Sequence, residues 1–280
     1  MKTSDTYGQR GNGVFQFFLS AFVFSWVFFL IGHYTNQLFL ILFGIWAPSL
    51  LALLWTFINH GKTGLKKFLK RFGRVNVAWY WWILLLLLPA AIHLAGKNLW
   101  TIIYNGQLDF SVLPLLYWPG AIIPSILIAG VGEELGWRGY ALPRLQKQFS
   151  PLVASLILGI VHFLWHLPTY WLGQGIHNVP ALFALLFILP WSIIFTWIYN
   201  KSGGSLLFAV GFHAISNASL AIVRFMPLES QVAITPDLIT QLYLPTELAG
   251  PYLSVVAVYL LAAVLVLLFG NFKEANTDLP

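Results

Sequence analysis

The sequence of 280 residues contains no cysteine and very little charge. The lack of cysteine excludes disulfides, Cys-ligated zinc, iron–sulfur clusters and thiol nucleophiles. Charged residues make up 9% of the chain and hydrophobic residues 59%, whereas a soluble globular protein carries about 25% charged residues. A soluble fold of this length could not bury so much apolar surface, so the composition indicates a protein whose solvent is lipid.

Eight apolar stretches are long enough to cross a bilayer, whose hydrocarbon core of about 30 Å requires about 20 helical residues. We therefore predict an all-α fold, a polytopic membrane helical bundle that forms one transmembrane domain over residues 1–280. The first stretch lacks a signal-peptide cleavage site and is expected to be retained. In the fourth, the part from Gly139 to Phe149 is polar enough to leave the bilayer. The stretches are 13–34, 37–59, 79–96, 119–148, 151–171, 179–199, 204–226 and 250–270.

Basic residues gather in alternate loops, and this asymmetry predicts orientation because cytoplasmic loops are enriched in Lys and Arg. We predict a multi-pass protein of the cell membrane with both termini in the cytoplasm. The net charge of +6 is attributed to topology, so no nucleic-acid partner is expected. Segment 60–78 is interpreted as a cytoplasmic anchor, with an amphipathic surface helix as the alternative. The cytoplasmic set is Lys2, Arg10, Lys62, Lys66, Lys67, Lys70, Arg71, Arg74, Arg144, Lys147, Lys201 and Lys273, against Lys97 and Arg224 on the other side.

Glu133 and Glu134 are the acidic residues inside an apolar stretch, and Arg138 follows one turn later. A charge at mid-bilayer costs about 2.5–3.5 kcal/mol on insertion scales, so such residues are functional candidates. Glu134 and Arg138 lie at i and i+4 on one helix face, where they can form a structural ion pair. Glu133 points about 100° away, and it is predicted to have a catalytic or ligand role.

Two other stretches place polar side chains at i and i+4. These are His162 and His166 in the fifth stretch, and His213 and Asn217 in the seventh. A lone intramembrane histidine is more often a hydrogen-bonded packing residue, but polar side chains on three helices indicate a shared site. The remaining histidines lie near predicted helix ends or in loops and are interpreted as interfacial; they are His33, His60, His93 and His177.

Three segments resemble the motifs of the CPBP family, which contains CAAX proteases and bacteriocin-processing enzymes and is also called the Abi family. Residues 132–139, GEELGWRG, are similar to its EExxxR motif, and residues 165–168, WHLP, to the end of its FxxxH motif. Residues 213–217, HAISN, are similar to its HxxxN/D motif. The three motifs occur in the family's order on separate apolar stretches, and the family-like core covers about residues 120–220.

The resemblance implies a helical membrane fold with a cavity between helices, and an intramembrane endopeptidase whose prenyl-processing members cut near a substrate C-terminus. It implies that Glu133 and His166 activate water, while His213 and Asn217 stabilise the oxyanion or hold a metal. Glu134 and Arg138 would be supporting structure. His162 stands where the second motif often has Phe; it is interpreted as bonding a neighbouring helix, with a ligand or proton relay as the alternative. The implied partners are the lipid bilayer and a peptide or protein substrate.

Two catalytic arrangements stay open at the level of sequence. In one, Glu133 is the general base and His166 assists it. In the other, Glu133, His166 and His213 bind a divalent metal such as zinc, although H-E-x-x-H is absent. Both require Glu133 and His166 to approach within about 5 Å in one cavity that His213 and Asn217 share.

Three other functions have less support in the sequence. Serine catalysis has little support because G-x-S-x-G is absent. A proton-coupled transporter would typically show two repeated halves, which this sequence lacks. A bacteriocin-immunity or peptide-binding membrane protein is the remaining non-catalytic alternative.

Overall fold

The computed structural model describes residues 8–173, 176–224, 236–241 and 244–275, and these ranges contain helices and no strand. Eight helical units in them are long and apolar enough to cross a membrane, which confirms the predicted all-α fold. The units are Gly13–Tyr34, Leu38–Gly73, Trp79–Asn105, Leu115–Gln146, Pro151–Trp171, Ala181–Lys201, Leu206–Val223 and Thr246–Phe269.

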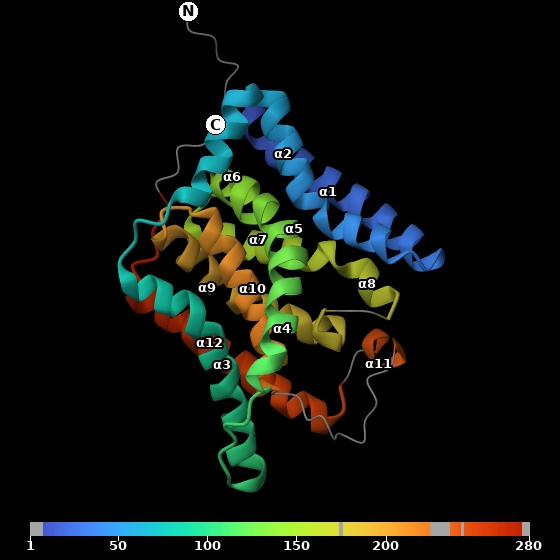
Figure 1. Cartoon of the computed structure of the whole chain (residues 1–280), viewed down its shortest axis with the longest axis vertical. Helices are drawn as coiled ribbons and strands as arrows, with labels where there is room; N and C mark the ends of the chain where they lie inside the picture. Colours follow the sequence, from blue (N-terminus) through green and yellow to red (C-terminus); the bar gives the residue numbers. More distant parts are fainter. Residues whose placement is uncertain (1–7, 174–175, 225–235, 242–243, 276–280) are drawn as a thin grey trace, which may run out of the picture.

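The bundle has outer helices on two sides and further helices between them (Figure 1). Helices α1 (Gly8–Tyr34) and α2 (Leu38–Leu69) pack along one side, and α3 (Trp79–Asn105) packs against α12 (Thr246–Phe269) on the other. Between them lie α7 (Pro151–Trp165), α9 (Ala181–Lys201) and α10 (Leu206–Val223). The outer helices expose large apolar side chains, such as Phe15 and Leu19 on α1 and Leu265 on α12, as expected of surfaces that face lipid.

The fourth span is not one regular α-helix. Short α-helices α4 (Trp118–Pro124), α5 (Gly132–Glu134) and α6 (Leu142–Gln146) alternate with π-helical stretches at Ser125–Val131 and Leu135–Ala141. Single turns of π-helix are rare and are often found at functional sites. Here they flank the two glutamates on both sides, so this span presents Glu133 and Glu134 from an irregular segment.

Glycines allow this span to pack closely against its neighbours. A Cβ atom on Gly136 would lie 2.6 Å from the carbonyl carbon of Pro48 in α2, and one on Gly130 would lie 2.8 Å from the carbonyl oxygen of Val210 in α10. Small residues permit such close approach of helices in lipid. The acid-bearing segment is therefore clamped between α2 and α10.

Segment 60–78 is more than a basic anchor. Helix α2 runs to Leu69 through a kink at Gly61, where φ is +61°. Arg71 follows and is buried, and its guanidinium donates to the carbonyls of Gly139 (2.6 Å) and Gly204 (3.2 Å) and to the Tyr199 hydroxyl. Arg71 thus ties the end of α2 to the fourth span and to the turn before α10.

Two sequence interpretations on α3 were wrong. The helix continues nine residues beyond the predicted end at 96, so Lys97 is a helical residue and not a loop residue. It is buried and forms a 2.8 Å ion pair with Asp109, which satisfies its charge. His93 is not interfacial but fully buried, and its Nδ1 donates to the Pro89 carbonyl at 2.8 Å. In the fourth span, Gln146 is also buried within the protein.

Candidate functional site

One cavity of about 330 Å³ collects the polar residues that the motifs singled out. Glu133 reaches it from α5, His162 and His166 from the end of α7, and His213 and Asn217 from α10. The predicted convergence of these three spans is confirmed. The rest of the wall is apolar apart from two residues, and it consists of Phe29, Ile41, Ile45, Phe187, Ile188 and Trp191, with Thr169 and His177.

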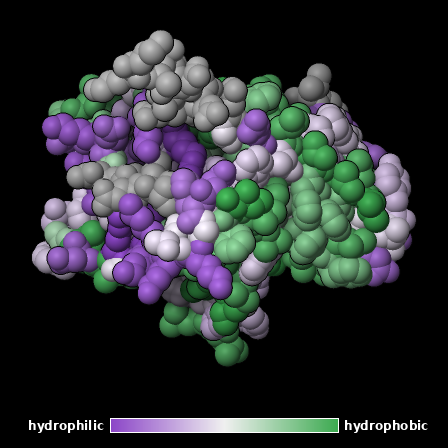
Figure 2. Space-filling model, turned by 90° about the horizontal axis from the view of Figure 1, so that it is seen from above, coloured by the Kyte–Doolittle hydropathy of each residue, from purple (hydrophilic) through white to green (hydrophobic). Residues whose placement is uncertain are grey.

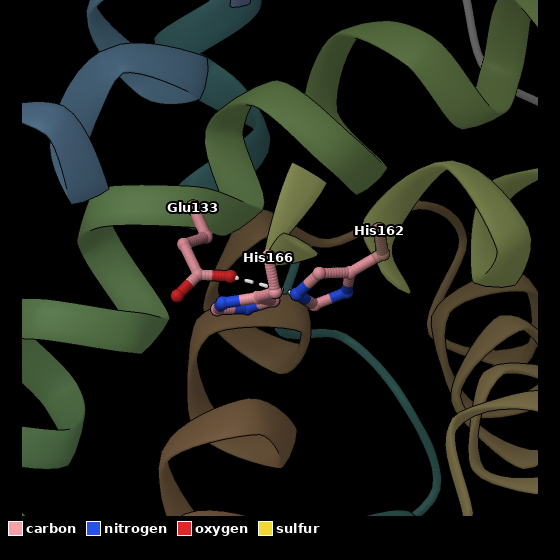
Figure 3. Close-up of side chains that lie close together, drawn as sticks. All are labelled: Glu133, His162 and His166. Carbon is pink, nitrogen blue, oxygen red and sulfur yellow. Dashed lines mark ion pairs between the residues drawn. The ribbon is translucent and has the colours of Figure 1, made fainter. Parts of the chain in front are cut away.

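Glu133, His162 and His166 point toward one another (Figure 3). The Oε2 atom of Glu133 lies 3.0 Å from Nε2 of His162. One ligand atom from each of the three residues lies within 4.8 Å of those of the other two, which meets the predicted approach of Glu133 and His166. His162 thus contacts a neighbouring span, as interpreted from the sequence, with Glu133 as its partner, and it also lines the cavity.

Glu134 lies in a separate, fully buried ion pair. Nη1 of Arg138 donates to both carboxylate oxygens of Glu134, at 3.0 and 3.1 Å. The guanidinium carbon lies 3.5 Å from the ring centroid of Phe195, within cation–π distance. The pair expected from the i, i+4 spacing is present, and it neutralises Glu134 within its own span.

Glu134 also orients His213. Nδ1 of His213 lies 2.6 Å from Oε1 of Glu134. An ionised carboxylate only accepts hydrogen bonds, so the proton of this bond lies on Nδ1. In the neutral ring, Nε2 is then an acceptor, and it can donate to an oxyanion only when His213 is protonated. His213 is also absent from the close group of ligand atoms, where His162 stands in its place.

Aromatic rings hold His162 in position. The centroids of Trp137, Trp165 and Trp191 lie 5.8, 6.0 and 5.8 Å from the imidazole centroid. Trp137 and Trp165 are fully buried. Packing from three sides restricts the ring and excludes solvent from the side away from the cavity.

Two buried polar atoms of the cluster make no hydrogen bond to any described part of the chain: Oε2 of Glu133 and Nδ1 of His162. The contact of Glu133 with His162 is close, but it lacks hydrogen-bond geometry. Burying a polar group without a hydrogen bond is costly, and burying a charge more so. The Glu133 carboxylate is therefore the natural place for a water, a substrate group or a cation to bind.

Sequence reasoning missed His177, which was interpreted as interfacial. It lies between α8 (Leu167–Trp171) and α9, lines the cavity, and its Nδ1 is 3.2 Å from the hydroxyl of Tyr252 in α12. Burial, and to a smaller extent the charges that His93 and His213 would carry, lowers the pKa of His177 to about 3. The ring is thus neutral at physiological pH. The short helical turn that carries it has no periodic pattern that could have revealed its direction.

Comparisons with known proteins match the segment that carries the cavity. The sequence model of the family described as type II CAAX prenyl endopeptidase Rce1-like matches residues 114–219. A protein of Methanococcus maripaludis named CAAX prenyl protease 2 is 29% identical over 227 residues, which cover 72% of this chain and 81% of that protein. The family match includes Glu133, His166 and His213, and also Asn217.

Proposed function

We propose that this chain, an intramembrane endopeptidase of the CPBP family, hydrolyses a peptide bond near the C-terminus of a membrane-associated substrate. The observation that carries the proposal is the convergence of Glu133, His166, His213 and Asn217 on one cavity. The substrate class follows the name of the relative, a CAAX prenyl protease. Both family matches favour this function over an immunity protein or a transporter.

Glu133 is assigned as the general base. Peptide hydrolysis requires an activated water within hydrogen-bond reach of a proton acceptor. The Oε2 atom of Glu133 is buried and has no hydrogen bond from the described chain, so it is free to accept a proton from water. His166 lines the same cavity, with a ring nitrogen within 4.8 Å of a Glu133 oxygen. His166 is assigned to orient the water, and the protonated Glu133 then gives its proton to the leaving amine as the peptide bond breaks.

Asn217 and His213 are assigned to the oxyanion that forms on the substrate carbonyl. Preorganised donors stabilise such a developing charge strongly in a site that excludes water. Asn217 contributes amide N–H groups that donate in any protonation state. His213, held at Nδ1 by Glu134, contributes a donor at Nε2 in the protonated form of its ring. Glu134 and Arg138 thus act as positioning residues.

A divalent metal such as zinc is the second way to activate the water. The donor set fits, because one carboxylate with imidazoles and an open position is typical of catalytic zinc. Glu133 and His166 would be ligands, and His213 offers the free Nε2 of its neutral ring. When bound, the ion would act as a Lewis acid and lower the pKa of a bound water.

The test is a cleavage assay on the purified full-length chain. A library of C-terminal peptides, prenylated and unprenylated, is incubated with the protein in detergent, and the products are read by mass spectrometry. We expect Glu133→Gln to lower the rate by about 100-fold or more, the range typical of lost general-base catalysis. Glu247→Gln makes the same change at an exposed position on α12 and is expected to retain the wild-type rate.

Two outcomes would contradict the proposal. One is a Glu133→Gln protein that cuts as fast as wild type. The other is a wild-type protein that is folded, binds peptides and cuts none of them, which would favour the peptide-binding alternative.

A further inference from the structure

We propose that Glu133, His162 and His166 form a binding site for one divalent transition-metal ion, and that His162 is the residue that gives this chain the site. The inference concerns the cavity of the proposed function and rests on it for the role of a bound ion. Binding itself does not depend on catalysis.

The three side chains already lie close to the geometry of a metal site. Zinc binds imidazole nitrogen and carboxylate oxygen at about 2.0–2.2 Å, so tetrahedral ligands lie about 3.3 Å apart. Glu133 and His162 are at 3.0 Å, and all three ligand atoms are within 4.8 Å of one another. Moving the most distant pair of ligand atoms together by up to about 1.5 Å would complete the set. The two histidines share one helix face at i and i+4, the spacing that zinc helices use.

The neighbouring carboxylate of Glu134 is already occupied, and His213 lies outside the close group of ligand atoms, which selects these three. Both oxygens of Glu134 accept from Arg138, and Nδ1 of His213 is bonded to Glu134. By contrast, Oε2 of Glu133 has no hydrogen bond from the described chain. A divalent cation would compensate the charge of this buried carboxylate. The two imidazoles would complete a set of three ligands that suits a transition metal such as zinc.

His162 supplies a third ligand at a motif position that usually offers none. In the motif that residues 162–166 resemble, the first position is often Phe, which has no ligand atom. Without His162, the close group would contain one carboxylate and one imidazole, too few for a stable site. With it, three protein ligands remain and the fourth position faces the cavity. The tryptophans around the ring, Trp137, Trp165 and Trp191, hold it in place by packing.

The test measures metal binding directly. The full-length chain is purified without a histidine tag, treated with EDTA, and titrated with Co²⁺, which reports coordination through its visible absorption. Zn²⁺ competition and the metal content after desalting give the stoichiometry. We expect one ion per chain in wild type, and a loss of affinity of about 100-fold or more in His162→Phe and in Glu133→Gln, since removing a direct ligand exceeds the 10–100-fold effect of an outer partner.

His60→Phe is the matched control, because His60 is exposed and distant in sequence from the cluster. It is expected to bind Co²⁺ like wild type. If His162→Phe does not fold, Glu133→Gln carries the test, because it keeps the side-chain shape. Wild type that binds no stoichiometric Co²⁺ or Zn²⁺, or a folded His162→Phe that binds as tightly as wild type, overturns the metal site. Neither result affects cleavage by metal-free protein, so the two proposals fail separately.

Discussion

At the scale of single residues, two adjacent glutamates in the membrane have opposite surroundings. Glu134 is held by Arg138 and His213, while Oε2 of Glu133 receives no hydrogen bond from the described residues. The difference follows from the helix, because Glu134 and Arg138 share a face and Glu133 points to the cavity. Of these two neighbouring carboxylates, Glu134 therefore stabilises the fold, and Glu133 is available to react in the cavity.

We predict that Glu134→Ala destabilises the protein strongly. Nε and Nη2 of Arg138 make no hydrogen bond to the described chain, so Glu134 is the anion on which this buried guanidinium depends. Removing one partner of a buried ion pair costs about 3–5 kcal/mol. We expect the melting temperature in detergent to fall by about 5 °C or more. Glu133→Gln, in the same turn, is expected to melt like wild type.

A second substitution separates this cause from a general loss of packing. Glu134→Ala combined with Arg138→Met removes the stranded charge, and replacing a whole buried pair by apolar residues is often neutral. The double variant should therefore melt well above Glu134→Ala. Equal melting temperatures for the single and double variants would show that the ion pair is not what stabilises this segment.

At the scale of helices, glycine contacts set the spacing of the bundle. A Cβ atom on Gly96 of α3 would lie 2.5 Å from the Cα atom of Val255 in α12. Because the Cα atom of Val255 belongs to the backbone, it cannot rotate away from an added methyl group as a side chain could. The two helices must therefore separate. We predict that Gly96→Ala costs about 1–3 kcal/mol through overpacking, measured as a lower melting temperature in detergent.

Gly120→Ala is the control for this prediction. Gly120 lies in α4, and nothing lies within 4 Å of a Cβ atom placed there. The added methyl group meets no neighbour, and alanine favours helix over glycine by about 1 kcal/mol. Its melting temperature should stay level or rise. If the melting temperature of Gly120→Ala fell as far as that of Gly96→Ala, the α3–α12 contact would not be the cause of the lower stability.

The helices themselves could be predicted from sequence, because eight long apolar stretches leave few alternatives in lipid. Their ends could not, since polar residues near an end can be paired by tertiary contacts, as Lys97 is by Asp109. The π-helical turns around Glu133 were not predictable either. These stretches contain Gly130 and Gly136, which approach α10 and α2 closely, and no local pattern encodes those contacts.

The site, too, could be predicted from sequence only in part. The i, i+4 spacings and the motifs led to Glu133, His166, His213 and Asn217, and all four line the cavity. The partners of each ring were not predictable, because they depend on how spans far apart in sequence rotate against each other. Thus His213 bonds Glu134, and His162 contacts Glu133. His177 lines the cavity from the segment between α8 and α9.

At the scale of the whole molecule, polar and apolar side chains occupy different parts of the surface. Seen from the end where α2 and α6 lie, hydrophilic side chains gather over one part of the surface beside a large hydrophobic area (Figure 2). The end of α2 carries exposed Lys62, Lys66 and Lys67. Positive charge marks the cytoplasmic side of a membrane protein. We therefore propose that this end faces the cytoplasm, together with both termini.

The last prediction tests that orientation, and the absence of cysteine makes the test clean, because each introduced thiol is unique. Lys66 lies exposed near the end of α2, and Gln107 lies exposed just beyond the opposite end of α3. With a membrane-impermeant maleimide, Lys66→Cys should be labelled in inverted vesicles and protected in intact cells, and Gln107→Cys should behave in the reverse way. The wild-type chain controls for background labelling. Labelling of Lys66→Cys from outside intact cells would invert the proposed topology.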